Sequence, residues 1–499
     1  MRTKNVIKNI LASWLGQIVM FICNLFSRWV FLQVLSLEYL GISGLFVNIL
    51  TILSFADLGL SASIAYYLYE PLANNDYNRI RQIVKCYKKI YSTIGIGVFV
   101  VGCAFIPFLP VIVGETSIEN ITFIYCMYIF NSSISYFNVH KATLINADQK
   151  GYITTSYTNV IKFVQVLAAI CVLYITRSYI CFYLVQIIAT IVTNVLISKK
   201  ADSLYPYLSE RMSQDGQGDI WVKIRNNMGS MSIHKFAEVI VNGTDNILVS
   251  VFVNLSAVGL YNNYLTIINC INNVVNSLFY SMSASIGNYS VSESNEKKKE
   301  LFDTLIFMEF WSYGFCSICL YVLLTPFIRL IFGDGYQLNE LTVFVIVLNF
   351  YIQGMRRIVL SFRNAEGLWK QDRYKAILEA VVNLVVSVVL ARRYGMIGVF
   401  LGTTVSLLLS CVWLEPLILF KYAFHCSTAG YFLNYIKYLL EILAVGFITY
   451  YLCSLLESVS FISFALKAVL CAIVSNVLLL GANWKNRYFR ILVRRITHK

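Results

Sequence analysis

Long apolar stretches recur from one end of this sequence to the other, and they constrain its fold more than any other feature. Most are about 20 residues or longer, which is the length that an α-helix needs to cross the hydrocarbon core of a membrane. Only 13% of the 499 residues are charged, whereas a soluble protein carries about 25%. The sequence therefore predicts an all-α polytopic membrane protein.

Fourteen transmembrane spans are predicted from these stretches. They cover residues 9–35, 40–66, 90–113, 121–140, 155–176, 179–198, 230–253, 258–287, 304–328, 339–360, 376–391, 396–420, 438–455 and 461–482. The first span is too long for the apolar region of a cleavable signal peptide, and no small-residue cleavage site follows it. It is therefore expected to remain in the protein as a helix.

The distribution of basic residues predicts the orientation of these spans. When the N-terminus is placed in the cytoplasm, 30 of the 40 Lys and Arg residues fall in cytoplasmic segments and four fall in outer loops. Both termini are therefore expected to be cytoplasmic. The C-terminal tail, residues 483–499, interleaves basic and apolar residues, which suits a short amphipathic helix at the membrane surface. This membrane role accounts for the net charge of +14, so no nucleic-acid partner is expected.

Two echoes within the sequence indicate an internal duplication. The phrase GLFVNILTI at 44–52 returns as GLYNNYLTI at 259–267. Asn-Ala-Asp at 146–148 returns as Asn-Ala-Glu at 364–366, which is nearly the same offset along the chain. Each copy occupies the same place relative to its predicted spans. Six helices followed by six more in the same orientation predict a transporter plan with parallel repeats and a substrate path between the halves.

This plan predicts two parallel six-helix lobes around a central cavity, followed by two further helices. The predicted parts are an N-terminal lobe (1–200), a cytoplasmic linker (201–229), a C-terminal lobe (230–425), helices 13 and 14 (426–482) and a basic tail (483–499).

Polar residues inside the seventh and eighth spans are candidate site residues. In the seventh span, His234, Glu238, Asn242 and Asp245 are spaced by four, four and three residues, so they share one helical face. The eighth span has a stripe of asparagines, namely Asn262, Asn269, Asn272, Asn273 and Asn276. Two interpretations remain open. The stripes can line a cavity where amides meet sugar hydroxyls, or they can form helix-to-helix hydrogen bonds of about 0.6–2 kcal/mol each.

Ionisable residues within spans are costly, at about 2.5–3.5 kcal/mol each on insertion scales, and they usually face a cavity or a partner. The basic ones considered for function are Arg28, Lys162, Lys235, Arg356 and Arg357, and the acidic candidates for ion coupling are Asp57, Glu238 and Asp245. Glu309 is a further charge in the ninth span.

Two of these basic sites have specific interpretations. The guanidinium groups of Arg356 and Arg357 suit a diphosphate, although both side chains can instead extend to the lipid headgroups. Arg28 corresponds by the repeat to a position close to Asp245, so these two residues are predicted to pair when the cavity closes.

Several enzyme classes are disfavoured by what the sequence lacks. It has no phosphate-binding P-loop, no GxGxxG and no HExxH motif, and its predicted outer loops are short. A membrane-embedded polymerase or ligase would ordinarily carry its catalytic groups on a sizeable outer loop. The sequence therefore predicts a transporter rather than an enzyme, with no cofactor.

Three phrases carry a resemblance to a known family. They are LSLEYLGISGLFVNILTILSFADLGL at 35–60, TDNILVSVFVNLSAVGLYNNYLTI at 244–267, and NAEGLWKQDRYKAILEAVVNLVVSVVL at 364–390 followed by YGMIGVFLGTTVSLLL at 394–409. These phrases resemble the O-antigen and capsule repeat-unit (Wzx-like) flippases of the polysaccharide transporter family. These flippases belong to a superfamily that also contains multidrug extruders and the lipid-linked peptidoglycan precursor flippase.

The resemblance implies that a polyprenyl-diphosphate-linked oligosaccharide crosses a bacterial cell membrane by alternating access. Cationic groups such as Arg28 would neutralise the diphosphate, and the asparagines would meet the sugars. Implied partners are membrane lipid, a polysaccharide polymerase, glycosyltransferases and a coupling proton or sodium ion. The alternatives are a multidrug exporter of the same fold and a peptidoglycan precursor flippase.

Overall fold

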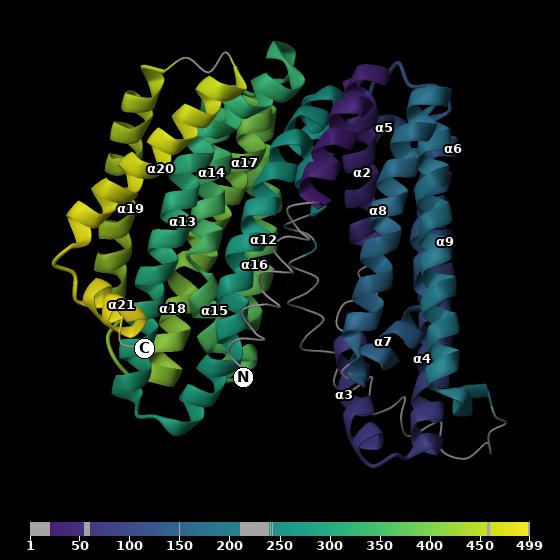
Figure 1. Cartoon of the computed structure of the whole chain (residues 1–499), viewed down its shortest axis with the longest axis horizontal. Helices are drawn as coiled ribbons and strands as arrows, with labels where there is room; N and C mark the ends of the chain where they lie inside the picture. Colours follow the sequence, from purple (N-terminus) through teal and green to yellow (C-terminus); the bar gives the residue numbers. More distant parts are fainter. Residues whose placement is uncertain are drawn as a thin grey trace. The chain divides into compact units, whose positions relative to one another are not determined.

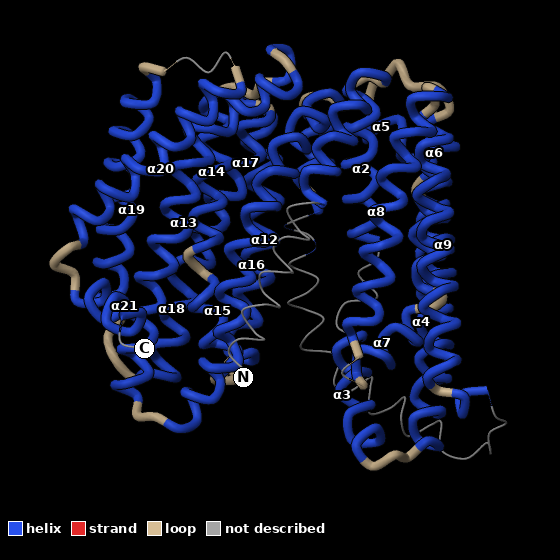
Figure 2. Tube along the Cα trace, viewed as in Figure 1, coloured by secondary structure: helices blue, strands red, loops and turns tan. Residues whose placement is uncertain are grey.

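The structure is a computed structural model that describes residues 20–53, 60–148, 150–209, 239, 241, 243–456 and 460–497. Within these ranges the chain is helical with short connections and no strands, which confirms the predicted fold class (Figure 2). The residues separate into two compact units, Met1–Gly259 (unit 1) and Leu260–Lys499 (unit 2). The division falls inside a helix, and the predicted bounds of the two lobes, the linker and the tail stay predictions.

In the part that the structure describes, unit 1 contains a first helix, Met20–Val34, and nine further α-helices (Figure 1). They are α2 (Leu37–Leu53), α3 (Leu60–Ala73), α4 (Tyr77–Ala104), α5 (Leu109–Val113), α6 (Ile121–Tyr136), α7 (Val139–Ala147), α8 (Gly151–Thr176), α9 (Tyr179–Leu204) and α11 (Asp245–Phe252). One apolar cluster of this unit gathers residues from α2, α6 and α9, among them Phe46, Tyr125 and Tyr183, and a second gathers residues from α3, α4 and α7.

Unit 2 begins within the long helix α12 (Leu255–Ser292) and continues to the C-terminus. Its other helices are α13 (Asn295–Phe332), α14 (Glu340–Gly354), α15 (Arg357–Ala365), α16 (Trp369–Tyr394), α17 (Met396–Ser406), the π-helix η5 (Leu407–Cys411), α18 (Val412–Leu419), the π-helix η6 (Phe420–Phe424), α19 (Ala429–Ser454), α20 (Phe461–Asn483) and α21 (Arg487–Thr497).

The predicted spans correspond to these helices. Each of the fourteen contains helix in the part that the structure describes. Nine described helical segments are long and apolar enough to cross a membrane by length and composition. The predicted amphipathic tail is α21. The chain is therefore a multi-pass membrane protein.

The internal duplication is visible in the helix boundaries. The helix α4 begins at residue 77 and α13 at 295, α7 covers 139–147 and α15 covers 357–365, and α8 covers 151–176 and α16 covers 369–394. Every one of these pairs has the same offset, which is also the offset between Asn146 and Asn364 in the Asn-Ala-Asp echo.

A swapped pair of side chains supports the same register. Gly95 of α4 packs against Tyr136 of α6, whereas at the equivalent positions of unit 2 Tyr313 of α13 packs against Gly354 of α14. In both units the same helix contact thus pairs one glycine with one tyrosine, and the two residues have exchanged helices.

The longer echo corrects one detail of the predicted alignment. In the structural register the counterpart of Gly259 is Gly41, not Gly44. Gly41 lies against the backbone of Leu255, and Gly259 lies against the backbone of Leu37, so the starts of α2 and α12 touch reciprocally. A shift of three residues is close to one helical turn, which preserves the face of the helix and explains why the sequences still match.

Candidate functional site

The tenth predicted span is broken in the middle, and the break brings charged residues together. The helix α14 ends at Gly354 and α15 begins at Arg357. A carboxylate from another helix caps the first turn of α15. The Ile358 N–H donates a hydrogen bond to Glu309 Oε1 of α13 at 2.9 Å. An equivalent break separates α6 from α7, but the position equivalent to Glu309 is Tyr91. The break therefore belongs to the repeated fold, while the carboxylate belongs to unit 2 alone.

Arg356 stands at this break and is held by two carboxylates. Its Nε and Nη2 atoms donate to both oxygens of Glu415 from α18, at 3.0 and 2.6 Å. Its Nη1 atom lies 3.4 Å from Glu379 Oε1 of α16. Such a bidentate contact between a guanidinium and a carboxylate is among the stronger hydrogen-bond arrangements in proteins.

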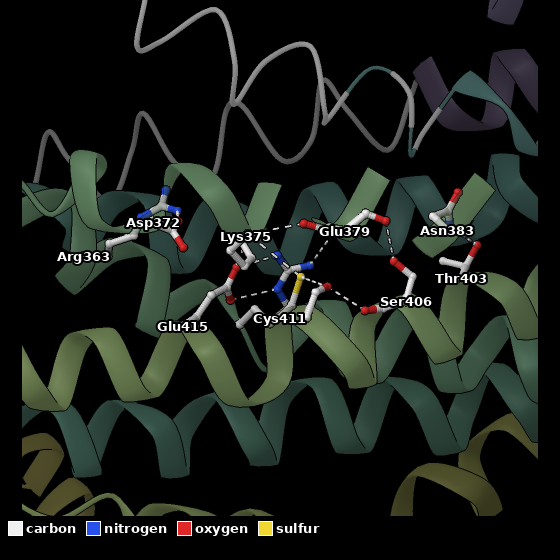
Figure 3. Close-up of polar contacts among 11 residues, drawn as sticks. Arg363, Asp372, Lys375, Glu379, Asn383, Thr403, Ser406, Cys411 and Glu415 are labelled. Carbon is white, nitrogen blue, oxygen red and sulfur yellow. Dashed lines mark hydrogen bonds and ion pairs between the residues drawn. The ribbon is translucent and has the colours of Figure 1, made fainter. Parts of the chain in front are cut away.

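Lys375 of α16 completes the cluster (Figure 3). Its Nζ atom lies 2.7 Å from Glu415 Oε1 and 3.3 Å from Glu379 Oε2. The side chains of Lys375 and Glu415 are 5% and 1% exposed. We call Arg356, Lys375, Glu379 and Glu415 the buried charge network; its two cations balance its two carboxylates.

Close helix packing brings α16 and α17 into range of each other. Gly398 and Gly402 of α17 lie directly against the backbone of α16, so that any larger side chain at either position would collide with it. One turn further on, Ser406 Oγ donates to the Glu379 carbonyl at 2.7 Å. Small residues four apart are the usual means by which membrane helices approach closely. The local sequence GVFLGTTVS therefore positions Glu379 beside α18.

A π-helix adjoins the network. Residues 407–411 form η5, and Cys411 Sγ lies 3.9 Å from Lys375 Nζ. Two further polar contacts of α16 flank the network (Figure 3). Asp372, which precedes Lys375, pairs with Arg363, and Asn383, which follows Glu379, donates to Thr403 at 3.1 Å. Single-turn π-helices occur frequently at functional sites.

Unit 1 shows how the same helices pack without these charges. At the offset of the repeat, Arg356, Lys375 and Glu379 correspond to Asn138, Tyr157 and Ile161. Glu415 follows the π-helix η5, whereas α9 has no π-helix. The residue equivalent to Glu415 is therefore Leu196 or Ile197, depending on whether η5 is taken to contain one residue more than the matching part of α9.

Burying a charge costs several kcal/mol even after the protein relaxes around it. Because the fold is built without these charges in unit 1, the network is not needed for the helix arrangement. It is therefore the strongest candidate for a functional site in the part of the chain that the structure describes.

The asparagine stripe of α12 divides into two groups. Tyr313 of α13 donates to Asn276 Oδ1 at 2.8 Å and lies 3.4 Å from Asn272 Oδ1, and Asn276 Nδ2 donates to Asn272 at 3.2 Å. These two amides therefore connect helices, as the second sequence interpretation proposed. Asn269 and Asn273 are exposed and Asn262 is half-buried. A role in lining a cavity stays a prediction for these three.

The predicted diphosphate ligands lie in different surroundings. Arg28 is half-buried on the first helix, and Lys162 is exposed on α8. Arg356 belongs to the buried charge network, and Arg357 lies close to the carboxylate of Glu309. Their predicted role would require Arg356 and Arg357 to exchange these carboxylates for phosphate.

Several predicted residues fall outside the described part of the chain. These are Asp57, His234, Lys235, Glu238 and Asn242. Asp245 is described as the first residue of α11, where it is half-buried. The predicted pairing of Arg28 with Asp245, and the roles of Asp57, Glu238 and Asp245 in ion coupling, stay predictions.

Sequence reasoning missed three members of the network, namely Lys375, Glu379 and Glu415. The signal was available, because Glu379 and Glu415 lie within predicted spans and Lys375 immediately precedes one. The same rule that selected Arg356 would have selected them.

Comparison with solved structures identifies the architecture. The structure of lipid II flippase MurJ in an inward closed conformation matches with a TM-score of 0.68 and 13% identity, over 94% of this chain and 98% of that one. An inward-facing multidrug resistance MATE family transporter of the MOP superfamily matches with a TM-score of 0.64 and 13% identity, over 80% and 94%. A mutant of the Vibrio cholerae MATE transporter VcmN matches at 0.55 and 14%, over 84% and 97%.

No family model matches the chain, and no curated protein sequence does. At 13–14% identity the likeness to the solved structures concerns the fold. The chain therefore has the fold of these membrane transporters, as the sequence predicted.

Proposed function

We propose that the chain is a flippase for a polyprenyl-diphosphate-linked oligosaccharide repeat unit, acting in capsule or O-antigen biosynthesis. The observation that carries this proposal is the extent of the match to the lipid-linked precursor flippase. That match covers 94% of this chain. The unmatched residues are fewer than the residues of α19 and α20 together, so at least part of these two helices is matched. The first MATE match covers 80% of this chain, which leaves a remainder long enough to contain both helices.

The physical chemistry of such a cargo suits a chain of this kind. A bare diphosphate cannot enter hydrocarbon, since an isolated buried charge costs tens of kcal/mol by Born solvation. A protein must therefore carry the polar head while the polyprenyl tail stays in lipid. The described mid-span ionisable residues of unit 1 include two basic ones, Arg28 and Lys162, and the acidic Asp245. An exporter of organic cations would be expected to present mainly acidic groups.

The same match also favours a second candidate, a flippase for a lipid-linked peptidoglycan precursor. Both candidates move an amphipathic diphosphate from the inner to the outer leaflet by alternating access, without covalent chemistry. In both, the chain would lie in a bacterial inner membrane with its termini in the cytoplasm. Glycosyltransferases would supply the cargo, and a polymerase would consume it on the other side.

We further propose that the buried charge network takes part in the conformational cycle. Its four members come from the α14–α15 break and from α16 and α18, so any relative movement of these elements must change their pairing. Binding of a proton or sodium ion to a carboxylate of this transporter would shift the balance between conformations. The asymmetry between the units supports this proposal, because unit 1 has no equivalent charges at these positions.

The test is lipid analysis of a deletion strain. The flippase proposal predicts that one complete polyprenyl-diphosphate repeat unit accumulates and that the surface polysaccharide is lost. A plasmid copy of the gene should reverse both effects. Accumulation of the peptidoglycan precursor would instead select the second candidate. If neither lipid accumulates and the polysaccharide is intact, both flippase candidates are wrong and drug sensitivity becomes the next measurement.

A further inference from the structure

The C-terminal helix α21, with the sequence RYFRILVRRIT, separates basic from apolar residues around its circumference. Arg487, Arg490 and Arg494 are spaced by three and four residues, so they share one face. Tyr488, Leu492 and the neighbouring apolar residues form the other. This is the pattern of a helix that lies in the plane of a membrane surface.

The first turn of α21 is docked on α13. Phe489 stacks on Trp311 with ring centroids 5.7 Å apart, and the Tyr488 hydroxyl donates to Asp303 at 3.1 Å. Burial, together with the nearby Asp303, raises the pKa of Tyr488 to about 12, so the hydroxyl keeps its proton at physiological pH. Arg487 pairs with Glu300 at 2.6 Å. These contacts hold the helix in a defined position against unit 2.

The middle of α21 presents side chains to the surroundings. Arg490 and Arg494 are exposed, and so is Val493. The Arg490 Nη2 atom donates to the backbone carbonyl of Lys485. Just before the helix, the Trp484 side chain is 69% exposed. Exposed tryptophan beside arginine is typical of the boundary between lipid tails and headgroups.

The position of α21 follows from the chain itself. The membrane-spanning helix α20 ends at Asn483 and α21 begins at Arg487. The three residues that link the two helices can span no more than about 14 Å. The helix α21 therefore begins close to the membrane surface where α20 emerges.

We propose that the exposed face of α21 binds the headgroups of anionic phospholipids, with Arg490 and Arg494 on the phosphates and Trp484 at the boundary of the acyl chains. The α13 contacts hold these groups at the depth of the headgroups. This interaction is independent of the identity of the transported cargo.

The experiment is a lipid titration of the purified full-length protein in neutral detergent, followed by native mass spectrometry. The titrants are phosphatidylglycerol and phosphatidylcholine. Each basic side chain near an anionic surface strengthens binding about five-fold. The double variant Arg490→Gln/Arg494→Gln should therefore lose roughly 5- to 30-fold in phosphatidylglycerol association and little in phosphatidylcholine association, the upper figure being that of a whole anionic surface.

A matched control is Arg392→Gln/Arg393→Gln, which removes two exposed arginines from the last turn of α16 and leaves α21 unchanged. It should keep phosphatidylglycerol association within about two-fold of wild type. An equal loss in both double variants, or none in the α21 variant, would overturn the proposal. So would displacement of the lipid by inorganic pyrophosphate at matched ionic strength, which would indicate a site for free phosphate instead.

Discussion

Glu415 is the residue on which the buried charge network depends most, because both cations lie closer to it than to Glu379. Arg356 uses two of its nitrogens on this carboxylate, and Lys375 uses its ammonium group. Pro416 follows it within α18. Neutralising Glu415 would leave two buried cations with Glu379 as their remaining partner in the network.

We expect Glu415→Gln to destabilise the protein by about 3–5 kcal/mol, as the loss of one partner from a buried ion pair does. The measurement is thermal unfolding of the detergent-solubilised protein. The control is Glu296→Gln, a change to an exposed carboxylate in the first turn of α13, which should shift stability by less than about 1 kcal/mol. Equal stability of the two variants would mean that the network is not a tightly coupled ion cluster.

A second prediction at the residue scale concerns Gly354. A methyl group added here would collide with the ring of Tyr313 and push its hydroxyl away from Asn276. We expect Gly354→Ala to cost about 1–3 kcal/mol through overpacking. Gly481→Ala in α20 is the control, because nothing lies within 4 Å of its added methyl. It should be neutral or slightly stabilising through helix propensity. The packing argument is refuted if both variants unfold at the same temperature.

At the scale of elements, the two units provide a natural comparison. The α6–α7 and α14–α15 breaks are built on the same helix boundaries, but the residues of the buried charge network beside the second break have uncharged residues at the equivalent positions beside the first. A repeated backbone with two different sets of side chains separates what the fold needs from what the function needs.

This comparison predicts the effect of transferring the residues of unit 1 into unit 2. The quadruple variant Arg356→Asn/Lys375→Tyr/Glu379→Ile/Glu415→Ile should fold and insert in the membrane but fail to restore surface polysaccharide in the deletion strain. It should also be more stable than Glu415→Ile alone, because the single change leaves buried charges unpaired while the quadruple removes them all. Normal polysaccharide from the quadruple variant would remove the network from the mechanism.

At the scale of the whole molecule, transport requires an energy source, and two of the three predicted coupling residues, Glu238 and Asp245, lie in the seventh span. We expect the double variant Glu238→Gln/Asp245→Asn to be present in the membrane at wild-type level yet unable to restore surface polysaccharide. Membrane fractionation and a polysaccharide assay measure the two properties separately. Wild-type polysaccharide production would eliminate these two carboxylates from ion coupling. Asp245 begins α11, whose next residue, Asn246, donates to the Gly44 carbonyl of α2.

The sequence predicted the helices well for a simple physical reason. Membrane helices must bury long apolar segments in lipid, so length and composition locate them without any knowledge of their neighbours. The duplication was detectable because residues at close helix contacts, such as Gly259, limit what can be substituted. The sequence alignment of the longer echo was shifted by three residues from the structural register, because adjacent turns of one helix face resemble each other.

The site was predicted less completely. Arg356 and Glu309 were recognised as costly charges within spans, but nothing in their sequence positions indicates their partners. Glu415 lies 59 residues from Arg356, and the two meet only because α15 packs on α18. The asparagine stripe was ambiguous for the same reason, since the position of Tyr313 decides which amides bridge helices.

The sequence by itself determined that this chain is a helical membrane protein with two related halves and a basic amphipathic end, because these properties depend on apolar length, periodicity and local repetition. Only the tertiary structure decided which charges neutralise each other. Ion pairing depends on distances of a few ångströms between helices that are far apart in the chain. The break at Arg356, the glycine contacts of α17 and the π-helix η5 set those distances in unit 2.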